Sequence, residues 1–87
     1  MNTITLTAPA HAHTGNGSAT YRIVTDSVLV AFPQIDYCIA VVSVWDGQNH
    51  GYAVVSFGAS SELAAVLGDP FDNSADAVAF ATELAGW

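Results

Sequence analysis

The sequence contains no lysine and a single arginine, Arg22, against eight aspartate and glutamate residues. Lysine is normally among the commonest residues of a protein, so the formal net charge of −7 comes from missing cations rather than from extra carboxylates. Nucleic-acid binding requires several cationic contacts to phosphates, and attraction to an anionic membrane requires clustered cations. The composition therefore argues against nucleic acids and membranes as direct partners.

Cysteine is almost absent as well, because Cys38 is the only one. A disulfide framework is excluded, and the position of Cys38 inside the apolar run from Tyr37 to Trp45 predicts a buried structural thiol. No stretch reaches the roughly 18 consecutive apolar residues of a membrane span. The first residues also lack the basic and apolar segments of a signal peptide. We therefore expect a cytoplasmic protein.

Hydrophobic residues, by contrast, are plentiful. They make up 52% of the 87 residues, and nine residues are aromatic, which is well above the level of a disordered chain. A chain of this length buries about 60–65% of its unfolded surface and cannot hold two separate cores. No linker, repeat or low-complexity tract interrupts the sequence, so residues 1–87 predict a single domain.

The first third of the chain predicts short strands separated by loops. Residues 3–7 alternate threonine with Ile and Leu, which is typical of a half-buried edge strand. Residues 8–18 are rich in Gly, Pro, Asn and Ser and predict a loop. A second strand is expected over 21–24 and a third over 28–32. The segment 26–32 is equally compatible with a helical turn capped by Asp26.

The clearest signal is a β-hairpin over residues 36–57. The run Ile35–Trp45 is rich in β-branched and aromatic residues, a short loop with Gly, Asp and Asn follows, and Tyr52–Phe57 is a second apolar run. Because both faces of the first run are apolar, we expect it to be the central strand of the sheet. Trp45 is expected to complete the core.

The last third changes to a helical period. Ser60 or Ser61 is placed to cap a short helix over 60–67, and Ser74 to cap a second helix over 74–85. Gly68 and Gly86 follow the two predicted helices, as is common at helix ends. The sequence therefore predicts an α+β fold in which an antiparallel sheet of about four to five strands is followed by two C-terminal helices.

Three histidines are the candidates for a metal site. His11 and His13 would share one side of a strand, and His50 in the hairpin loop could be a third zinc ligand. No Cys or Glu has matching spacing, and histidines in solvated loops explain the same pattern. We expect no metal and no other cofactor, although the sequence alone does not decide whether these histidines bind metal.

The residues of an enzyme active site are not recognisable. There is no Gly-x-Ser-x-Gly motif, no Cys–His pairing and no lysine for a Schiff base or phosphate loop. Asp69 and Asp72 could act as an acid–base pair, but surface carboxylates in a loop explain them as well. We therefore expect a protein that is not an enzyme.

The acidic residues are more informative, because five of them fall in the last 26 residues with no cation after Arg22. Asp76 and Glu83 are seven residues apart and would share one helix face, roughly 10 Å from each other along the axis. Such a row attracts a cationic surface and repels anionic partners. The alternative is ordinary solvation of a helix, although a solvated helix face normally mixes Lys with Glu. The five carboxylates are those of Glu62, Asp69, Asp72, Asp76 and Glu83.

Phe71 lies between Asp69 and Asp72 in the connector between the two predicted helices. An aromatic residue flanked by carboxylates in the sequence could anchor a protein interface. Packing into the core is an equal alternative. The predicted partner-binding surface thus consists of Phe71 and the five carboxylates.

A short, acidic, lysine-free chain with an α+β pattern and no catalytic residues resembles the phage-encoded inhibitors of bacterial defence systems. The nearest class is the anti-CRISPR proteins, in particular those acting on type I Cascade complexes. The resemblance rests on the size, charge and pattern of the whole chain, without a diagnostic motif. It implies direct binding to a Cas subunit in the host cytoplasm, where the acidic surface would act as a nucleic-acid mimic and block target DNA binding.

Two other functions fit the same features. An immunity protein or antitoxin would also be acidic and would neutralise a cationic nuclease or toxin. A phage structural accessory protein, such as a head or tail component, needs no face of one charge.

Overall fold

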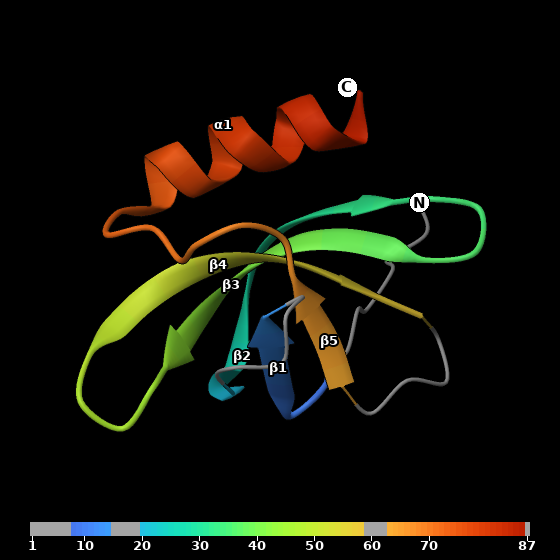
Figure 1. The fold of residues 1–87 in the computed structure, drawn as a ribbon. Coiled ribbons are helices and arrows are strands. Elements are labelled where there is room, and N and C mark those ends of the chain that lie inside the picture. The colour runs from blue at the N-terminus through green and yellow to red at the C-terminus, as the bar shows by residue number, and fades with distance from the viewer. Residues whose placement is uncertain (1–7, 15–19, 59–62, 87) are drawn as a thin grey trace.

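The computed structural model describes residues 8–14, 20–58 and 63–86, with residues 25 and 26 described by their backbone alone. These residues form five strands and one helix (Figure 1). The elements are β1 (His11–Thr14), β2 (Thr20–Pro33), β3 (Cys38–Trp45), β4 (His50–Phe57), β5 (Leu63–Val66) and α1 (Ser74–Ala85).

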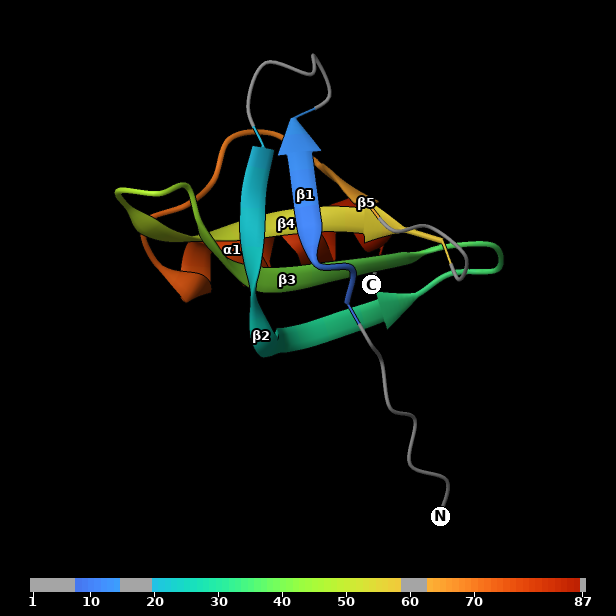
Figure 2. The same ribbon diagram turned by 90° about the horizontal axis from the view of Figure 1, so that it is seen from below.

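The strands close into a barrel in the order β1-β2-β3-β4-β5. Each strand is antiparallel to the next along the chain, while β1 and β5 pair in parallel. The parallel pair follows from the strand number, since the first and last strands of an antiparallel series of five point the same way. Figure 2 shows the result from below: β1 and the first part of β2 cross over β3 and β4, and the second part of β2 runs along β3.

The bend in β2 is made by an interruption of its pairing with β3. Ile23 pairs with Val44 but the next pair is Val28 with Val42, so residues 24–27 lie opposite Ser43 alone. The Ser27 hydroxyl replaces the missing backbone partner, because Oγ donates to the Ser43 carbonyl at 3.2 Å and accepts from the Ser43 N–H at 3.3 Å. The predicted strands at 21–24 and 28–32 are therefore one strand, and the helical-turn alternative for 26–32 is wrong.

The inside of the barrel is filled mainly by alanine and valine. A barrel of five strands is narrow, so small side chains at inward positions allow it to close. Alternate residues of each strand point inward, and the residues between them point outward. The buried inner residues are Ala12, Ile23, Cys38, Ala40, Val42, Val44, Ala53, Val55, Ala64 and Val66.

The predicted hairpin is confirmed, since β3 and β4 pair along their full length from Cys38–Phe57 to Trp45–His50. β3 is buried from Cys38 to Val44, as expected of a strand covered on both faces. The prediction that Trp45 completes the core is wrong, because its side chain is 42% exposed. Trp45 points outward because Val44 points inward, and at the end of β3 it lies outside the outer core that buries Ile39 and Val41.

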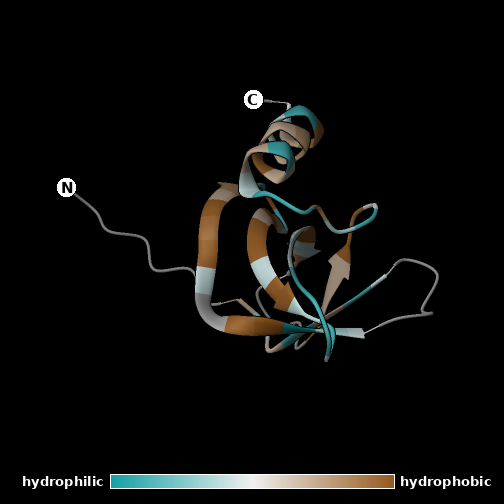
Figure 3. Cartoon of the chain, turned by 90° about the vertical axis from the view of Figure 1, so that its left-hand side faces the viewer, coloured by the Kyte–Doolittle hydropathy of each residue, from teal (hydrophilic) through white to brown (hydrophobic). Residues whose placement is uncertain are grey.

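α1 covers the outer face of β3 and β4 and forms a second core there. Ala77 and Ala81 are fully buried against a layer that includes Ile39, Val41 and Val54. Alanine at these positions allows the helix backbone to approach the sheet closely. Figure 3 shows the hydrophobic residues concentrated along the strands, with hydrophilic residues in the segment leading into α1 and on the helix itself.

The prediction of an antiparallel sheet followed by two C-terminal helices is wrong, because the sheet closes into a barrel through a parallel pair and one of the helices is a strand. The described residues hold one helix, and Leu63–Val66 of the predicted helix 60–67 forms strand β5; residues 60–62 lie outside the described part of the chain. An eight-residue helix is marginal in isolation, whereas β5 gains pairing with both β1 and β4 and buries Ala64 and Val66.

Two N-terminal predictions are also affected. The expected strand at 3–7 lies outside the described residues. Part of the expected loop at 8–18 is strand β1, because His11–Thr14 closes the barrel between β2 and β5.

Candidate protein-binding face

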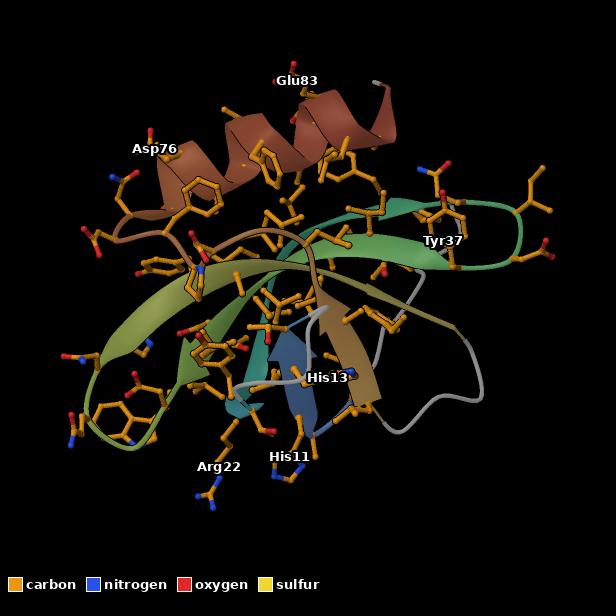
Figure 4. All side chains as sticks on the ribbon, in the orientation of Figure 1. His11, His13, Arg22, Tyr37, Asp76 and Glu83 are labelled. Carbon is orange, nitrogen blue, oxygen red and sulfur yellow. The ribbon has the colours of Figure 1, made fainter. Side chains whose placement is uncertain are left out.

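The acidic residues that the structure describes near the C-terminus are all exposed. Asp76 and Glu83 lie on the side of α1 that faces away from the barrel, as Figure 4 shows. Asp69 and Asp72 are exposed in the segment that precedes the helix. These four carboxylates are called the acidic face below. Glu62, the fifth residue of the predicted row, lies outside the described residues.

Asp76 has a structural role as well as an exposed charge. Asn73 is the N-cap of α1, where its Oδ1 accepts from the Asp76 N–H at 2.9 Å and its Nδ2 donates to the Asp76 carboxylate at 3.1 Å. The prediction that Ser74 caps the helix is therefore wrong by one residue, although the predicted range 74–85 is confirmed. A carboxylate in the first turn also interacts favourably with the positive end of the helix dipole.

The other three acids of the face have no such role. Within the described part of the chain, the carboxylates of Asp69, Asp72 and Glu83 form no hydrogen bond and no ion pair. Arg22, the only cation of the sequence, lies on the opposite side of the barrel from α1 (Figure 4). The negative potential of the acidic face is thus not cancelled by a neighbouring side chain.

Phe71 packs into the molecule and is half-buried. Its ring lies 5.6 Å from that of Phe80, and its backbone exchanges two hydrogen bonds with Tyr52, at 2.6 and 2.9 Å. The backbone bridge ties the segment before α1 to the start of β4. The sequence left two roles open for Phe71, an interface anchor and core packing. The structure shows Phe71 packed against the outer core.

Exposed apolar side chains lie on α1 itself, at Leu84, and in the β2–β3 loop. Ile35, at the tip of the β2–β3 hairpin, is 98% exposed, and Tyr37 and Leu84 are about half exposed. In Figure 4, Tyr37 lies below the C-terminal end of α1. The loop is held in shape by a 2.8 Å bond from the Gln34 N–H to the Tyr37 carbonyl. Residues 35–37, Ile-Asp-Tyr, put two large apolar side chains at a turn, where polar residues are usual. This unusual composition could have indicated the exposed apolar surface from the sequence.

A serine–histidine pair lies on the outer side of the β3–β4 hairpin, and sequence reasoning missed it. Ser43 Oγ is hydrogen-bonded to His50 Nε2, and the His50 ring meets Tyr52 edge to face at 5.7 Å. Ser43 is only 8% exposed. No carboxylate orients His50 among the described residues, so the third member of a catalytic triad is missing there. The pair joins the two strands near their turn.

The three histidines do not form a metal site. No group of three His, Cys, Asp or Glu side chains within the described ranges is arranged to hold a metal ion. His11 and His13 lie on β1, whereas His50 lies on β4 and bonds to Ser43. Cys38 is buried as predicted, and burial raises the pKa of its thiol, which disfavours the reactive thiolate.

Comparison of the chain with protein-family models, with curated proteins and with solved structures found no match. The helix of the described residues is also too short to cross a membrane.

Proposed function

We propose that this protein is an inhibitor that binds, through its acidic face, the positively charged and nucleic-acid-binding surface of a protein complex. The observation that carries the proposal is the set of exposed carboxylates on α1 and the segment before it, with the single cation on the far side of the barrel. A surface of one sign speeds the approach of an oppositely charged partner.

The structure of the helix supports this role in a second way. Its buried side consists largely of alanine packed on β3 and β4, so Asp76 and Glu83 extend from a fixed helix backbone. A backbone that is already fixed lowers the entropy lost on binding. The exposed Leu84 and Tyr37 supply apolar area beside the acidic face, as expected of an interface that combines charge with hydrophobic contact.

The partner class proposed is a Cas complex of a bacterial defence system, with type I Cascade as the first candidate. This choice rests on the resemblance in size, charge and pattern to anti-CRISPR proteins. By covering the positively charged DNA-binding surface of such a complex, this protein would prevent the complex from binding its DNA target.

The test is a competition between this protein and target DNA for purified type I Cascade. We expect DNA binding to fall as the protein is added, and the inhibition to weaken as salt rises, since the Debye length shrinks from about 10 Å at 0.1 M to 3 Å at 1 M. Normal DNA binding by Cascade in the presence of excess protein would refute this choice of partner.

The triple variant Asp69→Lys, Asp72→Lys and Glu83→Lys tests the face itself. It leaves Asp76 and the helix cap in place, so we expect a folded protein whose affinity falls at least a hundredfold, because three attractive charges become repulsive. The control is Gln48→Lys, which adds a positive charge at an exposed position in the β3–β4 turn and should have a much smaller effect. Equal effects of the triple variant and the control would show that no particular face is used.

A further inference from the structure

The side of the barrel opposite the acidic face carries a different cluster. Arg22 on β2 pairs directly with His11 on β1 and with Trp45 on β3. Their neighbours Ala12, Ile23 and Val44 point into the barrel, so His11, Arg22 and Trp45 all point outward. In Figure 4, His11 and Arg22 extend side by side from the barrel wall. We call these three residues the Arg22 cluster.

The side chains of the Arg22 cluster are available to a ligand. All three are exposed. Neither the Arg22 guanidinium nor the Trp45 indole has a hydrogen bond, ion pair or ring contact with another described side chain. An arginine beside an aromatic ring often stacks on it, and here that contact is not formed. The cluster thus presents a free cation between an imidazole and a free aromatic face.

One ring nitrogen of His13, on the same strand as His11, is unpaired within the described part of the chain. His13 is two residues from His11 on the outward side of β1, and its Nδ1 is enclosed without a hydrogen-bond partner among the described residues. Buried polar atoms in native proteins are nearly always paired, with protein, water or ligand. The nitrogen is covered by protein atoms, so it does not contact a ligand at the exposed cluster, and binding there depends on His11, Arg22 and Trp45.

We propose that the Arg22 cluster binds a small ligand with one phosphate group and a planar aromatic ring, as in a nucleoside monophosphate. The guanidinium and His11 would bind the phosphate, since arginine pairs with phosphate through two parallel hydrogen bonds. The indole of Trp45 would stack on the base, as aromatic side chains do in many nucleic-acid-binding proteins.

The charge of the chain sets the size of the ligand. One guanidinium matches one phosphate, whereas a long strand would meet a protein with a net charge of −7 and no second arginine or lysine. A free mononucleotide is therefore favoured over the end of a nucleic-acid strand. This site is separate from the acidic face, so it stands or falls independently of the proposed inhibition.

The test is a titration of the full chain with AMP. Binding is measured by calorimetry and by changes in the NMR signals of the Arg22 and Trp45 side chains. We expect saturable binding, with adenosine and inorganic phosphate each at least tenfold weaker than AMP. Arg22→Gln and Trp45→Leu should each weaken AMP binding at least tenfold, while Arg22→Lys retains part of it. Tyr37→Leu is the matched control, since it alters an exposed aromatic residue outside the cluster, and it should leave binding unchanged.

Several results would overturn the proposal. One is the absence of saturable AMP and oligonucleotide binding up to about 10 mM, far weaker than a specific site. Another is binding that Arg22→Gln and Trp45→Leu leave unchanged. A parallel titration with single-stranded oligo-dA distinguishes a free nucleotide from the end of a strand. Affinity per site equal to that of AMP supports a free nucleotide. Tighter binding of oligo-dA that is lost in both Arg22→Gln and Trp45→Leu supports a strand end at the same site. Tighter binding that persists in both variants counts against the site.

Discussion

The outer side of α1 and the outer wall formed by β1 and β2 lie on opposite sides of the barrel and differ in charge and in origin. The acidic face comes from one continuous stretch of chain, from Asp69 to Glu83, whereas the Arg22 cluster joins three strands. Charge on a single helix can be read from spacing, but a cluster across strands exists only through their register. The overall negative charge of the chain therefore does not describe every part of its surface. Arg22, His11 and Trp45 come together on one wall although cations are almost absent from the sequence.

The largest effect is expected where the helix meets the barrel. Ala81 is fully buried against the outer core, so Ala81→Leu should destabilise the protein by about 1–3 kcal/mol through overpacking. Ala79→Leu, at an exposed position of the same helix, should change stability by less than about 0.5 kcal/mol. Urea unfolding followed by circular dichroism measures both.

This pair of variants also tests the comparison of the two sides. In Ala81→Leu, NMR shifts should change in α1 and little around Arg22. Equal destabilisation by the two variants, or equal shifts on both sides, would show that the helix is not the separate layer described above.

A smaller effect is expected at the start of the acidic face. Asn73→Ala removes the side-chain acceptor for the Asp76 N–H and should cost about 1 kcal/mol, as for other N-caps. Asn73→Asp keeps an acceptor and should stay close to the wild type in a thermal melt. If Asn73→Asp were as unstable as Asn73→Ala, the cap would not be what holds the first turn.

The smallest effect concerns an acid outside the acidic face. Hydrogen bonds from the backbone N–H groups of Asn49 and Gln48 lower the pKa of the Asp46 carboxyl. A carboxyl whose pKa is lowered on folding stabilises the folded state above the unfolded value of about 3.9, and this contribution is lost as the pH falls through the folded value. Stability measured between about pH 5 and 2 should therefore fall less steeply in Asp46→Asn than in the wild type. An unchanged slope would place the acid sensitivity elsewhere.

The hairpin and the long helix could be predicted because their signals are local. β-branched residues on both sides of a turn give β3 and β4, and a capped run ending at Gly86 gives α1. Leu63–Val66 and His11–Thr14 could not be predicted, since four residues carry no clear period. They become strands because each pairs with partners far away in the sequence, such as Ala12 with Ala64.

The candidate sites divide in the same way. The exposure of Asp76 and Glu83 follows from carboxylates placed opposite an alanine-rich stripe, and Asp69 and Asp72 lie in the connector before the helix. The Arg22 cluster could not be predicted, because nothing in the sequence sets Arg22 opposite both His11 and Trp45. Sequence reasoning also placed Trp45 in the core, but Trp45 points outward at the end of β3 and lies outside the second core that buries Ile39 and Val41.

The sequence by itself determined the charge of this protein, its central hairpin and its C-terminal helix, because composition and local periodicity do not depend on distant contacts. Only the tertiary structure decided that the sheet closes into a barrel, that a predicted helix is a strand, and that the single arginine lies away from the acidic helix. These features depend on strand register, and register is fixed by which side chains can be buried together.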